Sequence, residues 1–114
     1  MRALVVMIGV SAAGCLSHRP DTQWATQVDA AVQVPNPQAR ANTLGSLAQS
    51  AAYDNDPASV RYALDRLDPG PKTDQVIAAC VAQLAQKDPA QARRISNRIA
   101  DDKLRAEVAG KLGN

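Results

Sequence analysis

The chain has 114 residues, of which 46% are hydrophobic and only 3% aromatic, and phenylalanine is absent. This length allows one small domain, and a formal net charge of +2 excludes the strong positive field that polyanion-binding domains carry. The core must therefore be built from Ala, Leu, Val and Ile, and Ala-rich segments of this kind favour closely packed helices.

The N-terminal segment has the parts of an export signal. Arg2 supplies a positive charge, Ala3 to Val10 form an apolar run, and Ser11 to Gly14 are small residues in front of Cys15. The apolar run is shorter than the roughly 20 residues that a transmembrane helix needs. The segment resembles a bacterial lipoprotein signal peptide, which ends in a lipobox, here Ala-Ala-Gly-Cys.

The resemblance implies cleavage between Gly14 and Cys15 and acylation of the Cys15 thiol, which would anchor the mature chain to membrane lipid. Leu16 stands where an Asp would resemble an inner-membrane retention signal, which favours the outer membrane, facing the periplasm. The alternative is an ordinary secretory signal cleaved near Ala13, with Cys15 an incidental thiol. The lipoprotein interpretation divides the chain into a signal peptide over 1–14, a lipidated tether over 15–20 and a single all-helical domain over 21–114.

Helix starts are marked by a capping residue followed by proline. Asn36-Pro37, Asp56-Pro57 and Asp88-Pro89 each place a side-chain acceptor at the N-cap and a residue without an N–H at the first helical position. Gln91 stands at capping-box spacing from Asp88. Asp101-Asp102 is expected to cap the last helix, where carboxylates favour the positive helix end.

Apolar residues at helical spacing follow these starts, and no segment alternates apolar and polar residues as a strand does. A further apolar stripe, on the N-terminal side of these helix starts, predicts a first helix over Asp21 to Val34, which ends before Pro35. We therefore predict an all-α fold of five or six helices without a sheet, in which short breaks make consecutive helices antiparallel. The apolar positions, helix by helix, are Trp24, Val28, Ala31 and Val32; Ala41, Leu44, Leu47, Ala48 and Ala51; Val60, Ala63, Leu64 and Leu67; Val76, Ile77, Cys80, Val81 and Leu84; Ala92, Ile95 and Ile99; and Leu104, Val108 and Leu112.

Two segments echo each other at the length of a helix pair. Ala-Ser-Val-Arg-Tyr-Ala-Leu-Asp-Arg-Leu follows Pro57, and Ala-Gln-Ala-Arg-Arg-Ile-Ser-Asn-Arg-Ile follows Pro89. Together with Leu44-Gly45 and Pro69, they make residues 37–113 similar to a degenerate helix-turn-helix repeat of the tetratricopeptide or HEAT kind. The resemblance implies stacked antiparallel hairpins, an α-solenoid-like arrangement, and a compact helical bundle is the alternative.

The sequence contains no recognisable catalytic set. The single histidine, His18, lies in the tether, and no Cys or His cluster has zinc-ligand spacing. Asp54-Asn55-Asp56 is similar to the start of a calcium loop, but without the following Gly and the distant Glu it favours helix capping. Cys80 lies on an apolar helix face, so we expect a buried, inert thiol, with a reactive or intermolecular thiol as the alternative. We predict no enzyme activity, no cofactor, no metal and no nucleic-acid partner.

Seven basic and four acidic residues lie between Lys87 and Asn114. Arg94 and Arg98 share a helix face there, and with Tyr53 and Tyr62, both expected to be exposed, they are candidate partner-binding residues. The alternative is a solvated face with local pairs such as Arg98 with Asp101.

The leading hypothesis is a membrane-anchored, non-catalytic helical-repeat adaptor for another cell-envelope protein. A structural envelope lipoprotein that self-associates through Ala-rich helix faces is the alternative, and a small enzyme or ligand carrier is the third. Trp24, close to the anchor, is expected to seal the first hairpin or to lie at the membrane interface.

Overall fold

The computed structural model describes residues 22–113, and within this range the protein is entirely α-helical, as the sequence predicts. The predicted signal peptide, the lipidation site Cys15 with its cleavage site after Gly14, and Asp21, the predicted start of the first helix, lie outside the described residues. The six helices of residues 22–113 are α2 (Thr22–Val32), α3 (Pro37–Tyr53), α4 (Pro57–Leu64), α5 (Pro71–Leu84), α6 (Pro89–Ser96) and α7 (Asp102–Lys111).

Four helices begin at the capping residues that the sequence predicts. The side chains of Asn36, Asp56, Asp88 and Asp101 each accept a hydrogen bond from the backbone N–H three residues further on. Each of these bonds satisfies an N–H group that has no partner inside its helix. The Asp54-Asn55-Asp56 segment accordingly ends α3 and starts α4, and Asn55 makes the turn with a φ of 58°.

Two local features differ from the capping patterns of the sequence. Helix α5 begins at Pro71 without a capping side chain, because its N-cap residue is Gly70. The capping box at Asp88 forms only in part, because the Gln91 side chain accepts a hydrogen bond from Arg61 Nη1 at 2.8 Å.

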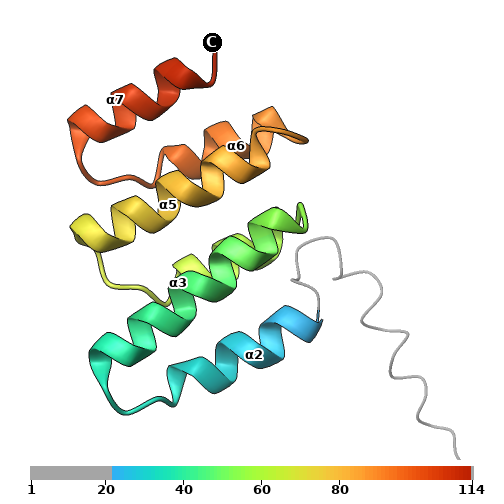
Figure 1. Ribbon diagram of the computed structural model, residues 1–114, viewed down its shortest axis with the longest axis vertical. Coiled ribbons are helices and arrows are strands. Elements are labelled where there is room, and N and C mark those ends of the chain that lie inside the picture. Colours follow the sequence, from blue (N-terminus) through green and yellow to red (C-terminus); the bar gives the residue numbers. More distant parts are fainter. Residues whose placement is uncertain (1–21, 114) are drawn as a thin grey trace, which may run out of the picture.

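The helices form two layers. Helices α3, α5 and α7 follow one another along the long axis, while α4 lies behind α3 and α6 behind α5 (Figure 1). Helix α2 contacts both α3 and α4. The core fills the space between the layers and is made of aliphatic side chains and alanines, as the composition requires. Its most deeply buried large members are Val28, Leu44, Val60, Cys80, Val81, Leu84, Ile95 and Ile99.

Helices α3 and α5 approach each other closely at Gly45. A Cβ atom on Gly45 would lie 3.1 Å from Val76 Cγ2, so the Val76 side chain would have to shift by a few tenths of an ångström to admit it. The absence of a side chain at this position therefore allows α3 and α5 to pack closely.

Helix α7 is attached more loosely than the others. None of its residues is buried, although Leu104, Val108 and Leu112 pack against the core in part. The turn before it is held by Asp74 in the first turn of α5, which is only 5% exposed and accepts hydrogen bonds from the backbone N–H groups of Ala100, at 2.9 Å, and Asp101, at 3.1 Å.

The predicted burial of Cys80 is confirmed. Its side chain has no solvent exposure, and burial raises the pKa of the thiol to about 12. Trp24 is half-buried against the core at the start of α2, as expected for a residue that seals the first hairpin.

Candidate functional site

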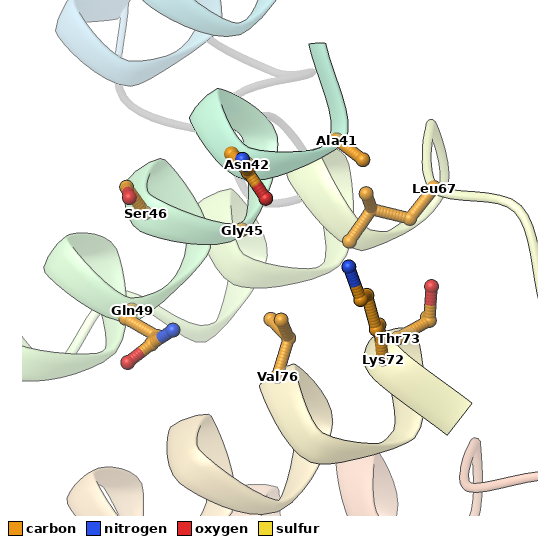
Figure 2. Close-up of a pocket in the computed structure, with 9 residues that line it drawn as sticks. All are labelled: Ala41, Asn42, Gly45, Ser46, Gln49, Leu67, Lys72, Thr73 and Val76. Carbon is orange, nitrogen blue, oxygen red and sulfur yellow. The ribbon is translucent and has the colours of Figure 1, made fainter. Parts of the chain in front are cut away.

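Two adjoining hollows run along the seam between α3 and α5, with volumes of about 290 and 370 Å³. Both are lined by Gln49, so they form one continuous surface, which we call the α3–α5 groove. Figure 2 shows the first hollow. The first hollow is lined by Ala41, Asn42, Gly45, Ser46, Gln49, Leu67, Lys72, Thr73 and Val76, and the second by Trp24, Gln49, Ser50, Tyr53, Asp54, Ala79 and Gln83.

The first hollow has a mixed polar and apolar lining and carries one positive charge. Lys72, in the first turn of α5, extends across the opening towards α3, where Asn42 and Ser46 line the opposite wall (Figure 2). Within residues 22–113, none of these three side chains makes a hydrogen bond or an ion pair, and no acidic side chain lines this hollow. Their hydrogen-bonding capacity is therefore available to a ligand.

The second hollow is bordered by aromatic rings. Trp24 is half-buried on α2, and Tyr53, at the last turn of α3, is 73% exposed. The amides of Gln49 and Gln83 line the same hollow without a partner among the described residues, and Asp54 supplies a carboxylate. The groove therefore has a cationic end at Lys72 and an aromatic, acidic end at Tyr53 and Asp54.

Several polar side chains of α2, α4 and the turn after α6, by contrast, are paired with one another. The Tyr62 hydroxyl on α4 donates to Asp29 on α2 at 2.6 Å, and this hydrogen bond raises the pKa of Tyr62. Arg98, in the turn that follows α6, forms an ion pair with Asp65, the C-cap residue of α4. Together with the bond from Arg61 to Gln91, these contacts link α2, α4 and α6 side by side.

The structure does not bring the four predicted partner-binding residues together. Tyr62 is half-buried, with the Arg66 guanidinium 3.7 Å above its ring, so the expectation of a free, exposed tyrosine is wrong. Arg98 pairs with Asp65 on the neighbouring helix and not with Asp101, because α4 and α6 lie alongside each other. Arg94 is exposed on α6, and Tyr53 lies in the α3–α5 groove.

The groove residues Asn42, Gln49 and Lys72 were not among the predicted site residues. A signal for two of them was present, because Asn42, Ser46, Gln49 and Tyr53 form a polar stripe at helical spacing on α3, beside its apolar stripe. Lys72 carried no such signal, since its place depends on how α5 packs against α3.

A third hollow, of about 340 Å³, lies between α5 and α7 and has a mostly aliphatic lining. Leu104, Val108 and Leu112 of α7 face Ala78 and Val81 of α5 across it, and the charged residues Glu107 and Lys111 complete the lining. It is the place where the loosely attached α7 does not close fully onto α5.

Over residues 22–113, no three or more His, Cys, Asp or Glu side chains gather in a way that would hold a metal ion. None of the helices in this range is both long enough and apolar enough to span a bilayer. Comparison with protein-family models, with curated proteins and with solved structures gives no match.

Proposed function

We propose that this protein is a lipid-anchored, non-catalytic adaptor that docks a segment of another cell-envelope protein in the α3–α5 groove. The observation that carries the proposal is where unpaired polar side chains gather. The Tyr62 hydroxyl and the Arg98 guanidinium are bound to carboxylates of neighbouring segments, whereas Asn42, Gln49 and Lys72, which line one groove, have no partner within the described chain.

The groove is suited to docking because its walls are already in place. Gly45 and Val76 hold α3 and α5 in close contact, so binding would order side chains without reorganising helices. A preformed site of this kind loses less conformational entropy on binding than a flexible one. The mechanism is therefore positioning of a partner, without turnover.

The lipid anchor would compensate for a shallow site. Both hollows are open to solvent and small, so the affinity for an isolated segment is expected to be modest. Acylation of Cys15 would hold the protein at the membrane, where an envelope partner is present at high local concentration. Docking and anchoring thus act together.

A photo-cross-linking residue placed at Gln49, in a C-terminally tagged protein in intact cells, tests this function. The matched position is Arg94, which is exposed on α6 in the other layer. We expect one dominant envelope protein to be captured from position 49, none from position 94, and less capture when Cys15→Ser removes the acylation site.

Capture of the partner only from position 94 would place the docking face on α6 and contradict the groove assignment. Cross-links only to other copies of the same chain would favour the self-associating structural lipoprotein. Capture that is unchanged by Cys15→Ser would contradict the role of the anchor.

A further inference from the structure

We infer that the α3–α5 groove selects an extended polypeptide segment that carries a carboxylate at the Lys72 end and an apolar side chain at the Trp24 and Tyr53 end. This inference rests on the proposed function and adds to it the chemistry of the docked segment. It follows from the charges, the amides and the length of the groove.

The charges along the groove set the place of the carboxylate. The Lys72 ammonium group extends into the first hollow, where it makes no ion pair and where no acidic side chain competes for it (Figure 2). At the opposite end, Asp54 lines the second hollow and would repel a negative charge. A segment with one carboxylate therefore binds more favourably with that carboxylate beside Lys72 than with it beside Asp54.

The side-chain amides along the groove match a polypeptide backbone. The side-chain amides of Asn42, Gln49 and Gln83 each offer an N–H donor and a carbonyl acceptor, which is what an extended chain needs for its own C=O and N–H groups. The Thr73 hydroxyl also lines the groove, but it donates a hydrogen bond to the Asp68 carbonyl and is not counted among these groups. The amides bind the backbone irrespective of sequence, so sequence selectivity falls to the two ends.

The aromatic end accepts an apolar side chain. Trp24, Tyr53 and Ala79 line the second hollow, and Tyr53 leaves most of its surface exposed. Covering such surface with an aliphatic group removes apolar area from water. At the rise per residue of an α-helix, Asn42 and Tyr53 lie about 16 Å apart along the axis of α3. An extended chain at roughly 3.3 Å per residue spans this distance in about five residues.

Synthetic peptides test the selectivity directly, with the fluorescence of Trp24, the only tryptophan of the chain, as the readout. The protein is the full chain carrying Cys15→Ser. The probes are acetyl-Asp-Ser-Gly-Ser-Gly-Leu-amide, its reversed sequence, and versions of both with Asn in place of Asp. A further peptide, with Asn in place of Asp and a free C-terminal carboxylate, shows whether the groove binds a terminal carboxylate as well as a side-chain carboxylate.

We expect one of the two Asp peptides to bind about three- to fivefold more tightly than its Asn version at low salt, as for a solvent-exposed ion pair. Lys72→Gln should remove this preference, and added salt should weaken it. The matched control is Lys103→Gln, an exposed lysine on α7 outside the groove, which should leave the preference unchanged. Thermal unfolding confirms that both variants fold.

Equal binding of the Asp and Asn peptides, a preference that survives Lys72→Gln, or no fluorescence change with any peptide would overturn the inference. These outcomes are distinct from failure of the adaptor function. If a partner is still captured from position 49 while the peptides show no preference, the groove docks a partner by other chemistry. If the peptides are selected but no envelope partner is captured, the adaptor function fails and the site chemistry stands.

Discussion

Gly45 is the residue on which the geometry of the groove depends. Because a Cβ atom there would already meet Val76 Cγ2 at 3.1 Å, the two further methyl groups of Gly45→Val would crowd Val76 more. We expect it to lower the free energy of unfolding by about 1–3 kcal/mol, the usual effect of overpacking. Urea unfolding followed by circular dichroism measures this change.

The control for this substitution is a glycine in open surroundings. Gly110, near the end of α7, has no atom within 4 Å of the position of its Cβ, so Gly110→Ala should gain helix propensity and stabilise the protein by up to about 1 kcal/mol. If Gly45→Val were as well tolerated as Gly110→Ala, the close contact between α3 and α5 would not be needed for stability.

Cys80 gives the protein a pH-dependent stability at alkaline pH. Its pKa is raised by burial from an ordinary value of 9.0 to about 12, so between these values the folded state keeps a proton that the unfolded state has lost. The stabilisation is complete below pH 9 and decreases as the pH rises towards 12. At pH 10 we expect the free energy of unfolding to be about 1.4 kcal/mol lower from this group than at pH 7.

The measurement compares urea unfolding at pH 7 and pH 10 for the full chain carrying Cys15→Ser, with and without Cys80→Ala. The variant lacks the thiol and should lose less stability between the two pH values, while other groups such as Tyr62 act equally in both proteins. Identical pH dependence in the two proteins would mean that the thiol is not shielded from solvent in the folded state.

At the scale of the element, α7 depends on one carboxylate of a neighbouring helix. Asp74→Ala leaves the backbone N–H groups of Ala100 and Asp101 without their acceptor, and since α7 has no buried residue, little else holds it. We expect the free energy of local opening of α7 to fall by about 2–3 kcal/mol. Hydrogen exchange measured by mass spectrometry should show faster exchange in α7 and little change in α3.

Two variants control for the loss of charge and of side-chain volume. Asp74→Asn keeps one acceptor oxygen and should give an intermediate effect. Asp102→Asn removes a carboxylate that is 90% exposed, pairs only with Arg105 and lies in the first turn of α7, so it should lower the free energy of opening by less than about 1 kcal/mol. Equal exchange rates of α7 in Asp74→Ala and the unmodified chain would show that the apolar contacts of Leu104, Val108 and Leu112 hold α7 by themselves.

The elements themselves could largely be predicted from sequence because their ends are fixed locally. Asn36, Asp56, Asp88 and Asp101 cap helices through atoms three residues away, which is within reach of a sequence pattern. The start of α5 was missed because Gly70 offers no side-chain cap and the pattern relied on one. Apolar spacing likewise predicted the buried face of each helix, including Cys80.

The candidate site could be predicted far less well, because it depends on contacts between distant segments. Asp65 and Arg98 are 33 residues apart in the chain and form their pair only when α4 and α6 lie side by side. Packing of α4 against α2 likewise engages the Tyr62 hydroxyl, whereas Lys72 keeps no partner among the described residues. Residue type alone does not separate a paired arginine from an unpaired lysine, so three of the four candidates, Arg94, Arg98 and Tyr62, lie outside the α3–α5 groove.

At the scale of the whole molecule, the two sides of the helix stack differ in how their polar side chains are used. Hydrogen bonds and an ion pair link α2, α4 and α6, whereas Asn42, Gln49 and Lys72 along the seam between α3 and α5 have no partner among the described residues. Such a division places the rigid support on one side and the recognition surface on the other. The α3–α5 groove is therefore the face from which partner binding is expected.

The composition of the surface predicts that the protein does not self-associate strongly. Among the described residues, the large hydrophobic side chains with substantial exposure are Val32, at 38%, and Tyr53, at 73%. A stable dimer usually buries about 800 Å² on each partner around an apolar centre, which two scattered side chains do not provide. We expect the full chain carrying Cys15→Ser to sediment as a monomer at micromolar concentrations in mild detergent. A dimer or larger species that dissociates on dilution and is weakened by Tyr53→Ala would instead support the self-associating structural lipoprotein, with the aromatic end of the groove as its contact.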